Sequence, residues 1–387
     1  MKAYLDNAAT TIPFPEVREI MMQTMEKDYG NPSSMHQLGI DAENYIKEAR
    51  QIIAKSLKAE EKEIIFTSGG TESNNQALIG AAFANKRKGM HLITTRIEHA
   101  SVYNPMLFLE EQGFRVSYIS VDKNGHINME ELLDAICEET ILVSIMYVNN
   151  EIGAVENIAD ISKKIKEKKN DIIFHVDAIQ AYGKYYIYPK RMGIDLLSVS
   201  GHKIHGPKGI GFLYIKDKLK INPYIYGGGQ QKGLRSGTEN VPGIAGLGMA
   251  AKLIYENQEE KIQRLYELKE YFIQKITALE DVYINGSDGM EITDMAPHVV
   301  SVCVKGVGSE VLLHALEDKG VYVSSGSACS SNHPALSGTL QAIGLEKKII
   351  ESTIRFSFSI FTTKEELDYA VTALEELLPI LRRYVRR

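Results

Sequence analysis

Lys203 stands in a segment that could make its amine a nucleophile. It lies in SGHKIHGPKGIG (200–211), a turn bounded by Gly and Pro, with one histidine directly before it and another two residues after it. Burial and neighbouring cations both lower the pKa of a lysine and free its lone pair, as a Schiff-base amine requires. The segment starts with the GxxxxG spacing of a P-loop, but Pro replaces the Lys that would follow. An exposed turn lysine is the alternative interpretation.

An aspartate and a glutamine follow a buried strand pattern just upstream. In HVDAIQAYG (175–183), Asp177 and Gln180 stand where a carboxylate costs free energy unless a cation lies beside it. A pyridinium nitrogen would be such a cation. An aspartate opposite the ring nitrogen, with a Schiff-base lysine nearby, is the arrangement that a pyridoxal phosphate enzyme needs. Asp177 could equally be the N-cap of a helix.

Three further segments place polar groups directly after predicted strands. A glycine pair and Thr71 in TSGGTESNN suit a phosphate cradle or a plain turn. His99 in RIEHAS could stack on a flat cofactor and move protons, or it could be a structural histidine. The amides of Asn149 and Asn150 in VNNEIGAV could bind a cofactor oxygen or a substrate carboxylate, or they could form a turn.

Cys329 is surrounded by small polar residues in SSGSACSSNHP (324–334), which is unusual for a structural cysteine. We expect an exposed, mobile thiol that can act as a nucleophile. A metal pair with His333 is the alternative, but no second pair at metal-ligand spacing supports it, so no metal site is predicted. Cys137 and Cys303 lie in helix and strand patterns and are expected to be small core residues.

Arg355 lies in the predicted strand TIRFSFS. An inward-pointing guanidinium could clamp a carboxylate through two parallel hydrogen bonds. Internal pairing with an acidic side chain is the alternative interpretation.

The strands that position these groups predict an α/β domain. Between about residues 63 and 216, short β-branched runs alternate with polar helical stretches, which is typical of a mainly parallel sheet covered by helices. Ligands bind to such sheets beyond the carboxyl ends of the strands. Seven strands are predicted at 63–68, 91–95, 115–120, 141–147, 171–176, 194–200 and 210–215, with helices at 72–88, 100–112, 128–138 and 157–169.

A second, smaller α+β domain is expected towards the C-terminus. Residues 252–280 have the apolar spacing of one long amphipathic helix that would lead into it. The basic end, LRRYVRR, indicates a helix C-terminus in preference to a nucleic-acid site. We assign residues 14–255 to the large domain and residues 1–13 plus 256–387 to the small one. Strands of the small domain are predicted at 299–305, 321–325 and 352–359, with helices near 308–319 and 363–383.

Composition places the chain among ordinary folded proteins. Its 387 residues are 44% hydrophobic and 24% charged, with a formal net charge of −6, which suits a protein of two domains. A pI near 6.0 gives no overall basic field for nucleic acid or an anionic membrane. No signal peptide and no apolar run of about 18 residues is apparent, so we expect a cytoplasmic protein. Three cysteines without a CxxC motif do not indicate a disulfide framework.

Taken together, these segments resemble one family, the pyridoxal phosphate-dependent cysteine desulfurases of the NifS/IscS type, group I. That family belongs to the class-V aminotransferase-like branch of fold type I. The resemblance implies a large domain that binds the cofactor and a small domain that carries the mobile cysteine loop. It runs in order through YLDNAATT, YGNPSSMH, TSGGTESNN, IEH, VNNEIG, HVDAIQ, SGHKIHGPKGIG, GGGQQKGLRSGTEN, SSGSACSS and IRFSFS.

The resemblance also implies a role for each matched residue. Lys203 would form the Schiff base, Asp177 would bind the pyridine nitrogen, and His99 would stack on the ring and move protons. Cys329 would accept the sulfur as a persulfide. The phosphate would be bound by Gly70, Thr71, Ser200 and His202, together with Thr238 of a second subunit. The phenolic oxygen would be bound by Gln180 and Asn150. The substrate carboxylate would be bound by Arg355, Asn31 and Asn150. A site completed across an interface implies a homodimer.

The implied activity is conversion of L-cysteine to L-alanine, with sulfur delivered to an acceptor protein for iron–sulfur cluster assembly or tRNA thiolation. A selenocysteine lyase or a class-V aminotransferase of the same fold is the alternative. Ser330 stands where the family often has threonine, and Gly70 where it often has alanine. The chain stops at Arg387, without the longer tail that IscS-type members use to dock a scaffold, so the acceptor stays open.

Overall fold

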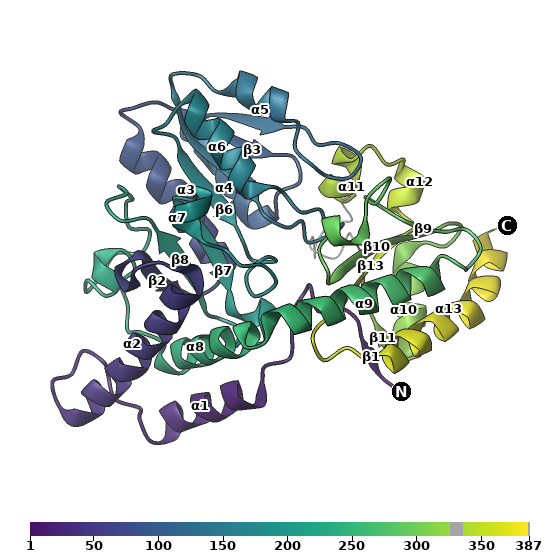
Figure 1. Ribbon diagram of the computed structural model, residues 1–387, viewed down its shortest axis with the longest axis horizontal. Helices are drawn as coiled ribbons and strands as arrows, with labels where there is room; N and C mark the ends of the chain where they lie inside the picture. The colour runs from purple at the N-terminus through teal and green to yellow at the C-terminus, as the bar shows by residue number, and fades with distance from the viewer. Residues whose placement is uncertain (326–335, 386–387) are drawn as a thin grey trace.

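The computed structural model describes residues 1–325 and 336–385, and its largest element is a seven-stranded sheet (Figure 1). Every strand runs parallel to the others except β8, which pairs antiparallel with both of its neighbours. This confirms the predicted α/β class, and each of the seven predicted runs forms a strand. In sheet order the strands are β2 (Ile64–Thr67), β8 (Gly211–Ile215), β7 (Leu196–Ser200), β6 (Ile173–Asp177), β5 (Thr140–Met146), β3 (His91–Thr95) and β4 (Arg115–Ile119).

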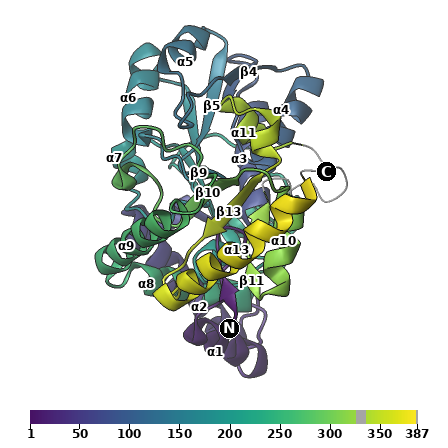
Figure 2. The same ribbon diagram turned by 90° about the vertical axis from the view of Figure 1, so that its right-hand side faces the viewer.

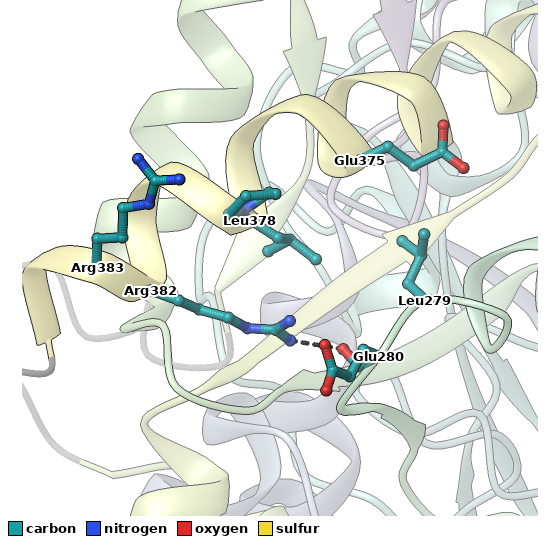
Figure 3. Close-up of a pocket in the computed structure, with 7 residues that line it drawn as sticks. Leu279, Glu280, Glu375, Leu378, Arg382 and Arg383 are labelled. Carbon is teal, nitrogen blue, oxygen red and sulfur yellow. Dashed lines mark hydrogen bonds between the residues drawn. The ribbon is translucent and has the colours of Figure 1, made fainter.

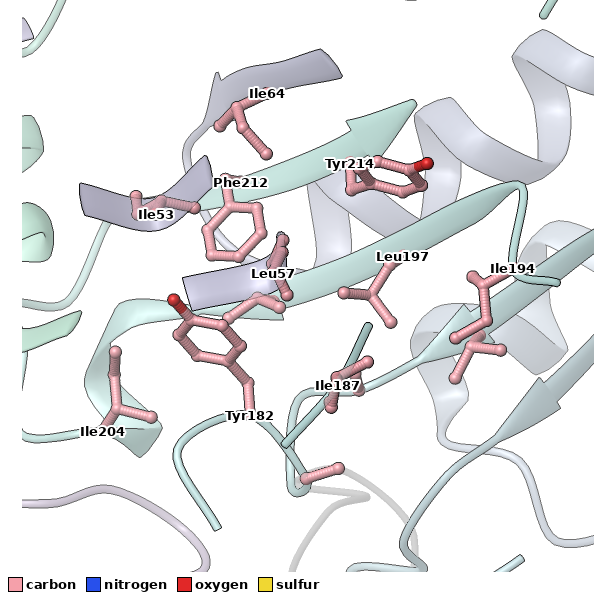
Figure 4. Packing of buried hydrophobic residues seen from close by; sticks show 14 of the residues in the cluster. Ile53, Leu57, Ile64, Tyr182, Ile187, Ile194, Leu197, Ile204, Phe212 and Tyr214 are labelled. Atoms are coloured by element: carbon pink, nitrogen blue, oxygen red, sulfur yellow. The ribbon is translucent and has the colours of Figure 1, made fainter. Parts of the chain in front are cut away.

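Helices cover both faces of this sheet because its central strands are apolar on both sides. Val143, Phe174 and Leu197 pack in one core with α2 (Gln37–Leu57), α6 (Ile158–Lys168) and α8 (Val241–Tyr255). Their sequence neighbours Leu142, Ile173 and Leu196 point to the opposite face and pack in a second core with α3 (Gly70–Asn85) and α4 (Ala100–Glu111). Figure 4 shows part of the first core, where Tyr182 and Phe212 meet edge to face at 5.2 Å between ring centroids.

Three further helices belong to this part of the chain. They are α1 (Pro15–Glu26), α5 (Met129–Ala135) and α7 (Pro189–Met192). No helix within the described residues is both long and apolar enough to cross a membrane.

A second sheet lies beside the first and is antiparallel throughout. Its strands, in order, are β12 (Ser324–Ser325), β13 (Thr353–Ser357), β10 (Val299–Val304) and β9 (Val282–Ile284). The N-terminal strand β1 (Ala3–Tyr4) joins this part of the molecule by pairing with β11 (Val321–Tyr322). Strand β1 and the C-terminal helix α13 (Lys364–Val385) lie together in this part of the molecule (Figures 1 and 2). The surrounding helices are α9 (Gln258–Ile276), α10 (Ser309–Asp318), α11 (Gly338–Ala342), α12 (Lys347–Ile350) and α13 (Lys364–Val385).

Three local predictions are wrong. The single helix expected over 252–280 is two helices, because Asn257 adopts the left-handed conformation with φ 50° between α8 and α9. The strand expected at 321–325 is divided between β11 and β12, which belong to different sheets. Cys137 is not in a helix core: it follows the end of α5, is half-exposed, and has its Sγ 3.1 Å from the Arg115 Nη2. Cys303 is buried in β10, as expected.

The C-terminal helix is tied to the smaller sheet through an arginine. Arg382 of α13 donates hydrogen bonds to the backbone carbonyls of Glu280 and Lys305, at 2.7 Å and 3.1 Å. Figure 3 shows the Glu280 contact at the edge of a shallow cavity between α13 and the chain that follows α9. The basic end of the sequence thus belongs to a helix C-terminus through Val385, as predicted.

Phe272 offers a test of the smaller core. Its ring is fully buried in α9 and lies 4.8 Å and 5.4 Å from the rings of Phe356 and Phe358. We expect Phe272→Ala to lower the free energy of unfolding by about 3–5 kcal/mol, because it leaves a cavity. Urea denaturation monitored by circular dichroism would measure this loss. Tyr283→Ala, at a side chain 51% exposed on β9, is the control and should change stability by less than about 0.5 kcal/mol. Equal losses would contradict the proposed packing.

Candidate functional site

A cavity of about 490 Å³ opens where three parallel strands end. Strands β5, β6 and β7 end at Met146, Asp177 and Ser200, and all three residues line it. This is the edge at which parallel sheets bind ligands, because neighbouring strands deliver their following loops to one place. The cavity brings together most of the predicted site residues, namely Gly70, Thr71, His99, Asn150, Asp177, Gln180, Ser200, His202, Lys203 and Arg355.

Asp177 is a buried carboxylate that faces this cavity. It is 4% exposed, and its two oxygens accept hydrogen bonds from the Ile179 backbone N–H at 2.9 Å and from the Asn74 amide at 2.8 Å. Burial raises its pKa, although these hydrogen bonds and the charges of His99 and Lys203 act in the opposite direction. A turn follows Asp177, so it is not a helix N-cap. The alternative interpretation of this residue is therefore wrong.

A chain of hydrogen bonds links Asp177 to His99. The Asn74 amide nitrogen donates to Asp177 and also to the Ser101 Oγ at 2.9 Å. The Ser101 Oγ lies 2.8 Å from His99 Nδ1, and the Ser101 backbone N–H donates to the same nitrogen at 3.1 Å. His99 Nδ1 is thus an acceptor, which leaves the proton of the neutral ring on Nε2. Burial lowers the pKa of His99, which favours this neutral form.

Lys203 ends a single 3-10 turn, η2 (Gly201–Lys203), that directly follows β7. Its Nζ donates to the backbone carbonyls of Ala8 and Ala9, at 2.5 Å and 2.7 Å. These carbonyls come from the N-terminal segment, nearly 200 residues away in the sequence. The backbone carbonyl of Lys203 accepts a hydrogen bond from Lys184 at 2.9 Å. The turn is therefore held from two sides.

The other end of the cavity suits a phosphate. Gly70 begins α3, and a Cβ there would lie 2.2 Å from the Ile179 Cδ1, so a larger residue would require the Ile179 side chain to move. The free N–H groups at the start of a helix attract anions. Thr71, Ser200 and His202 line the same region. Burial, followed by the charge of Lys203, lowers the pKa of His202 to about 4, so at neutral pH it can donate a hydrogen bond but carries no charge.

Arg355 is 7% exposed and reaches the cavity from β13. Its Nη2 forms an ion pair with Asp6 at 2.8 Å, and its Nη1 donates to the Asn150 carbonyl at 2.8 Å. Its Nε has no partner within the described residues. Arg355 therefore lines the cavity, as a carboxylate-binding residue would, and also forms the internal ion pair of the alternative interpretation.

Some contributors were not predicted from the sequence. Asn74, which orients Asp177, and Asp6, which pairs with Arg355, both lie inside motifs that the sequence had singled out. Only their position in these motifs could have indicated a role, because the neighbouring sequence does not show which residues they contact. His298 was also missed; its Nε2 lies 3.1 Å from the Gln180 Oε1.

Two predicted site residues within the described part of the chain do not line this cavity. Asn31 lies in the turn between α1 and α2, and Thr238 lies in the loop before α8; both are exposed. A role for either across a dimer interface stays a prediction. Cys329 lies outside the described residues, as does His333.

Comparison with known proteins places the chain in a family. The class-V aminotransferase model matches residues 3–370. A cysteine desulfurase IscS of Dictyoglomus turgidum is 44% identical over 382 residues, which cover 98% of this chain and 95% of that protein. A cysteine desulfurase IscS of Methanosarcina thermophila is 44% identical over 379 residues, covering 98% and 92%.

Solved structures agree with these sequence matches. A NifS-like protein superposes with a TM-score of 0.92 at 36% identity and covers 98% of this chain and 100% of its own. The apo cysteine desulfurase of Thermococcus onnurineus NA1 superposes with a TM-score of 0.88 at 27% identity, covering 98% and 95%. Such likeness over almost the full length shows that this chain belongs to the class-V aminotransferase family, among the pyridoxal phosphate-dependent cysteine desulfurases of the IscS/NifS type.

Proposed function

We propose that this enzyme binds pyridoxal phosphate in the 490 Å³ cavity and there converts L-cysteine to L-alanine, with the sulfur passing to Cys329. The observation that supports this best is the convergence of a buried aspartate, a lysine and a histidine on one cavity at the ends of parallel strands. SspA, whose solved structure contains cysteine, is 37% identical and superposes with a TM-score of 0.81 over 93% of this chain.

The cavity's residues fit this cofactor. Burial raises the pKa of Asp177, so a cation beside it would stabilise the carboxylate. A protonated pyridine nitrogen supplies that cation. The start of α3, with Thr71, Ser200 and His202, would hold the phosphate, and Gln180 with Asn150 would face the phenolic oxygen. When bound, pyridoxal phosphate withdraws electrons from the α-carbon of an attached amino acid.

Lys203 and His99 are the groups that we assign to proton transfer. Lys203 would bind the cofactor covalently, release it to the incoming amine and then move a proton at the substrate α-carbon. The carbonyls of Ala8 and Ala9 would hold its amine close to the cofactor after release. His99, with its proton on Nε2 and Nδ1 held by Ser101, would cover the ring and exchange a proton with the substrate thiol.

Arg355 would orient the substrate by binding its carboxylate. The Asp6 ion pair and the Asn150 carbonyl hold the guanidinium in place, so it does not have to be ordered when substrate binds. Asn31 and Asn150 would complete the carboxylate contacts.

Sulfur transfer is assigned to Cys329 from its sequence setting alone. Its thiolate would attack the sulfur of bound cysteine, form a persulfide, and leave alanine as the second product. Delivery would follow to an acceptor protein of iron–sulfur cluster assembly or tRNA thiolation. We also propose that the enzyme acts as a cytoplasmic homodimer in which Thr238 of one subunit reaches the phosphate of the other.

Replacing Cys329 tests the sulfur transfer. Cys329→Ser should still bind cofactor and cysteine but should form neither alanine nor sulfide when incubated with L-cysteine and a reducing thiol. Both products would be quantified in the same sample. Cys137→Ser, a change at a half-exposed thiol outside the cavity, is the matched control and should retain activity. Normal turnover by Cys329→Ser would refute the assignment.

Replacing Lys203 tests the cofactor attachment. Lys203→Ala should lose the visible absorbance of lysine-bound cofactor, and turnover should fall by roughly 10²–10⁴-fold or more because the proton carrier is gone. Absorbance spectra and alanine formation would measure the two effects. Lys208→Ala removes an exposed lysine from the same segment and should change neither. A Lys203→Ala protein with an unchanged spectrum would show that another amine binds the cofactor.

Replacing Arg355 tests substrate orientation. Arg355→Lys keeps the charge but cannot form two parallel hydrogen bonds with a carboxylate. We expect KM for L-cysteine to rise about 10–100-fold, because hydrogen bonds to charged groups contribute about 1.5–3 kcal/mol. Steady-state kinetics would measure this. The exposed Arg383 provides the control, Arg383→Lys, with an unchanged KM. A fall in kcat alone would instead place Arg355 outside the substrate contacts.

A further inference from the structure

A second, much smaller cavity lies behind Lys203. Its volume is about 20 Å³, and it is enclosed where the large sheet, the start of α9 and the smaller sheet meet. Five groups that can carry a charge line it: Lys184, Lys203, His205, Lys261 and His298. One water molecule needs about 10–15 Å³ of such space and two or more polar partners. The cavity therefore has room for one water and no more.

His298 determines what this cavity must contain. Its ring is 2% exposed, and its Nε2 lies 3.1 Å from the Oε1 of Gln180. The Gln180 amide cannot be turned over, because its Nε2 donates to the Ala8 carbonyl at 2.9 Å. The Gln180 Oε1 can only accept, so the His298 Nε2 must carry the proton. His298 Nδ1 is then a lone-pair acceptor in the neutral ring.

That acceptor has no donor within the described residues. Protonation of Nδ1 would not remove the need for a partner, because the charged ring is disfavoured at this buried position. Burial lowers the pKa of His298 well below its ordinary value, and Lys184, Lys269, Arg355 and Lys203 add to this effect. A buried acceptor without a donor destabilises the folded protein. His298 also lines the small cavity, so a donor placed there would satisfy it.

We propose that a single buried water fills this cavity, donates to His298 Nδ1 and accepts from Lys184, and that His298 is thereby the positioning residue of Gln180. Lys184 lines the same cavity and carries N–H donors whether charged or neutral. Burial, followed by the charge of Lys203, lowers the pKa of Lys184 to about 7, so both forms occur near neutral pH.

The consequence concerns the cofactor contact of Gln180 and rests on the function proposed above. With its oxygen held by His298, Gln180 can present only its NH₂ group to the site that it shares with Lys203. An NH₂ group donates to the cofactor's phenolate oxygen, whereas a reversed amide would repel it. His298 and the Ala8 carbonyl together thus orient the Gln180 amide so that it donates in this contact, and the water holds the far side of the His298 ring.

A crystal structure of the unmodified holoenzyme at high resolution tests the water directly. We expect one ordered water at about 2.7–3.2 Å from both His298 Nδ1 and Lys184 Nζ. An empty cavity, or a direct protein donor to Nδ1, would overturn the proposal. This observation needs no variant and no turnover.

A spectroscopic titration tests the positioning role. Donation from Gln180 stabilises the phenolate of the lysine-bound cofactor after its Schiff-base proton has left. His298→Phe removes the partner that orients Gln180, so the midpoint of the pH-dependent visible absorbance should rise by about one pH unit. His298→Gln can still donate to Gln180 and should restore most of the shift. His91→Phe, at another buried histidine far from the cavity, is the control and should leave the midpoint unchanged.

The outcomes separate the two proposals. If the wild-type protein takes up no cofactor, the proposed function fails. If it takes up cofactor but His298→Phe and His298→Gln both titrate like the wild type, the positioning role alone fails. A midpoint that rises equally in all three variants would reflect general destabilisation and would also overturn it.

Discussion

A carboxylate kept from water at the end of a parallel strand is the constraint on which the site depends. Asp177 is held by one backbone N–H and one amide, neither of which neutralises it. A buried carboxylate raises the free energy of the folded protein unless a cation lies beside it. The parallel order of β5, β6 and β7 places the remaining groups around that position. Helix α3 supplies Asn74, which donates to Asp177, and α4 supplies Ser101, which accepts from Asn74. Stability and cofactor affinity are therefore coupled at this edge.

The N-terminal segment joins this edge to the smaller sheet. The carbonyls of Ala8 and Ala9 hold the Lys203 amine, and Asp6 holds Arg355. The same segment pairs as β1 with β11, in the part of the molecule that carries β13. The lysine and the arginine thus share one support, although they come from different sheets. A change in the first ten residues would disturb both.

The sequence predicted the strands better than the connections between them. Apolar runs rich in β-branched residues predicted all seven strands of the large sheet, since burial on both faces leaves a strong local pattern in its central strands. The single helix expected over 252–280 is broken at Asn257 because amphipathic spacing continues from the last turn of α8 into α9, which follow one another in Figure 1. Only the left-handed residue between them shows the break. Cys137 was misplaced for a similar reason, because the helix pattern continues past the end of α5.

Residue type and order by themselves determined the fold class, the family resemblance and the residues that could hold a cofactor. A lysine in a tight turn and an aspartate after a buried strand are local signals, and local signals survive in a sequence. Tertiary structure alone decided that Asp6 pairs with Arg355, that Asn74 holds Asp177, and that His298 orients Gln180. These partners lie 349, 103 and 118 residues apart. No periodicity spans such distances, because the contacts arise only when strand order and core packing bring separate segments together.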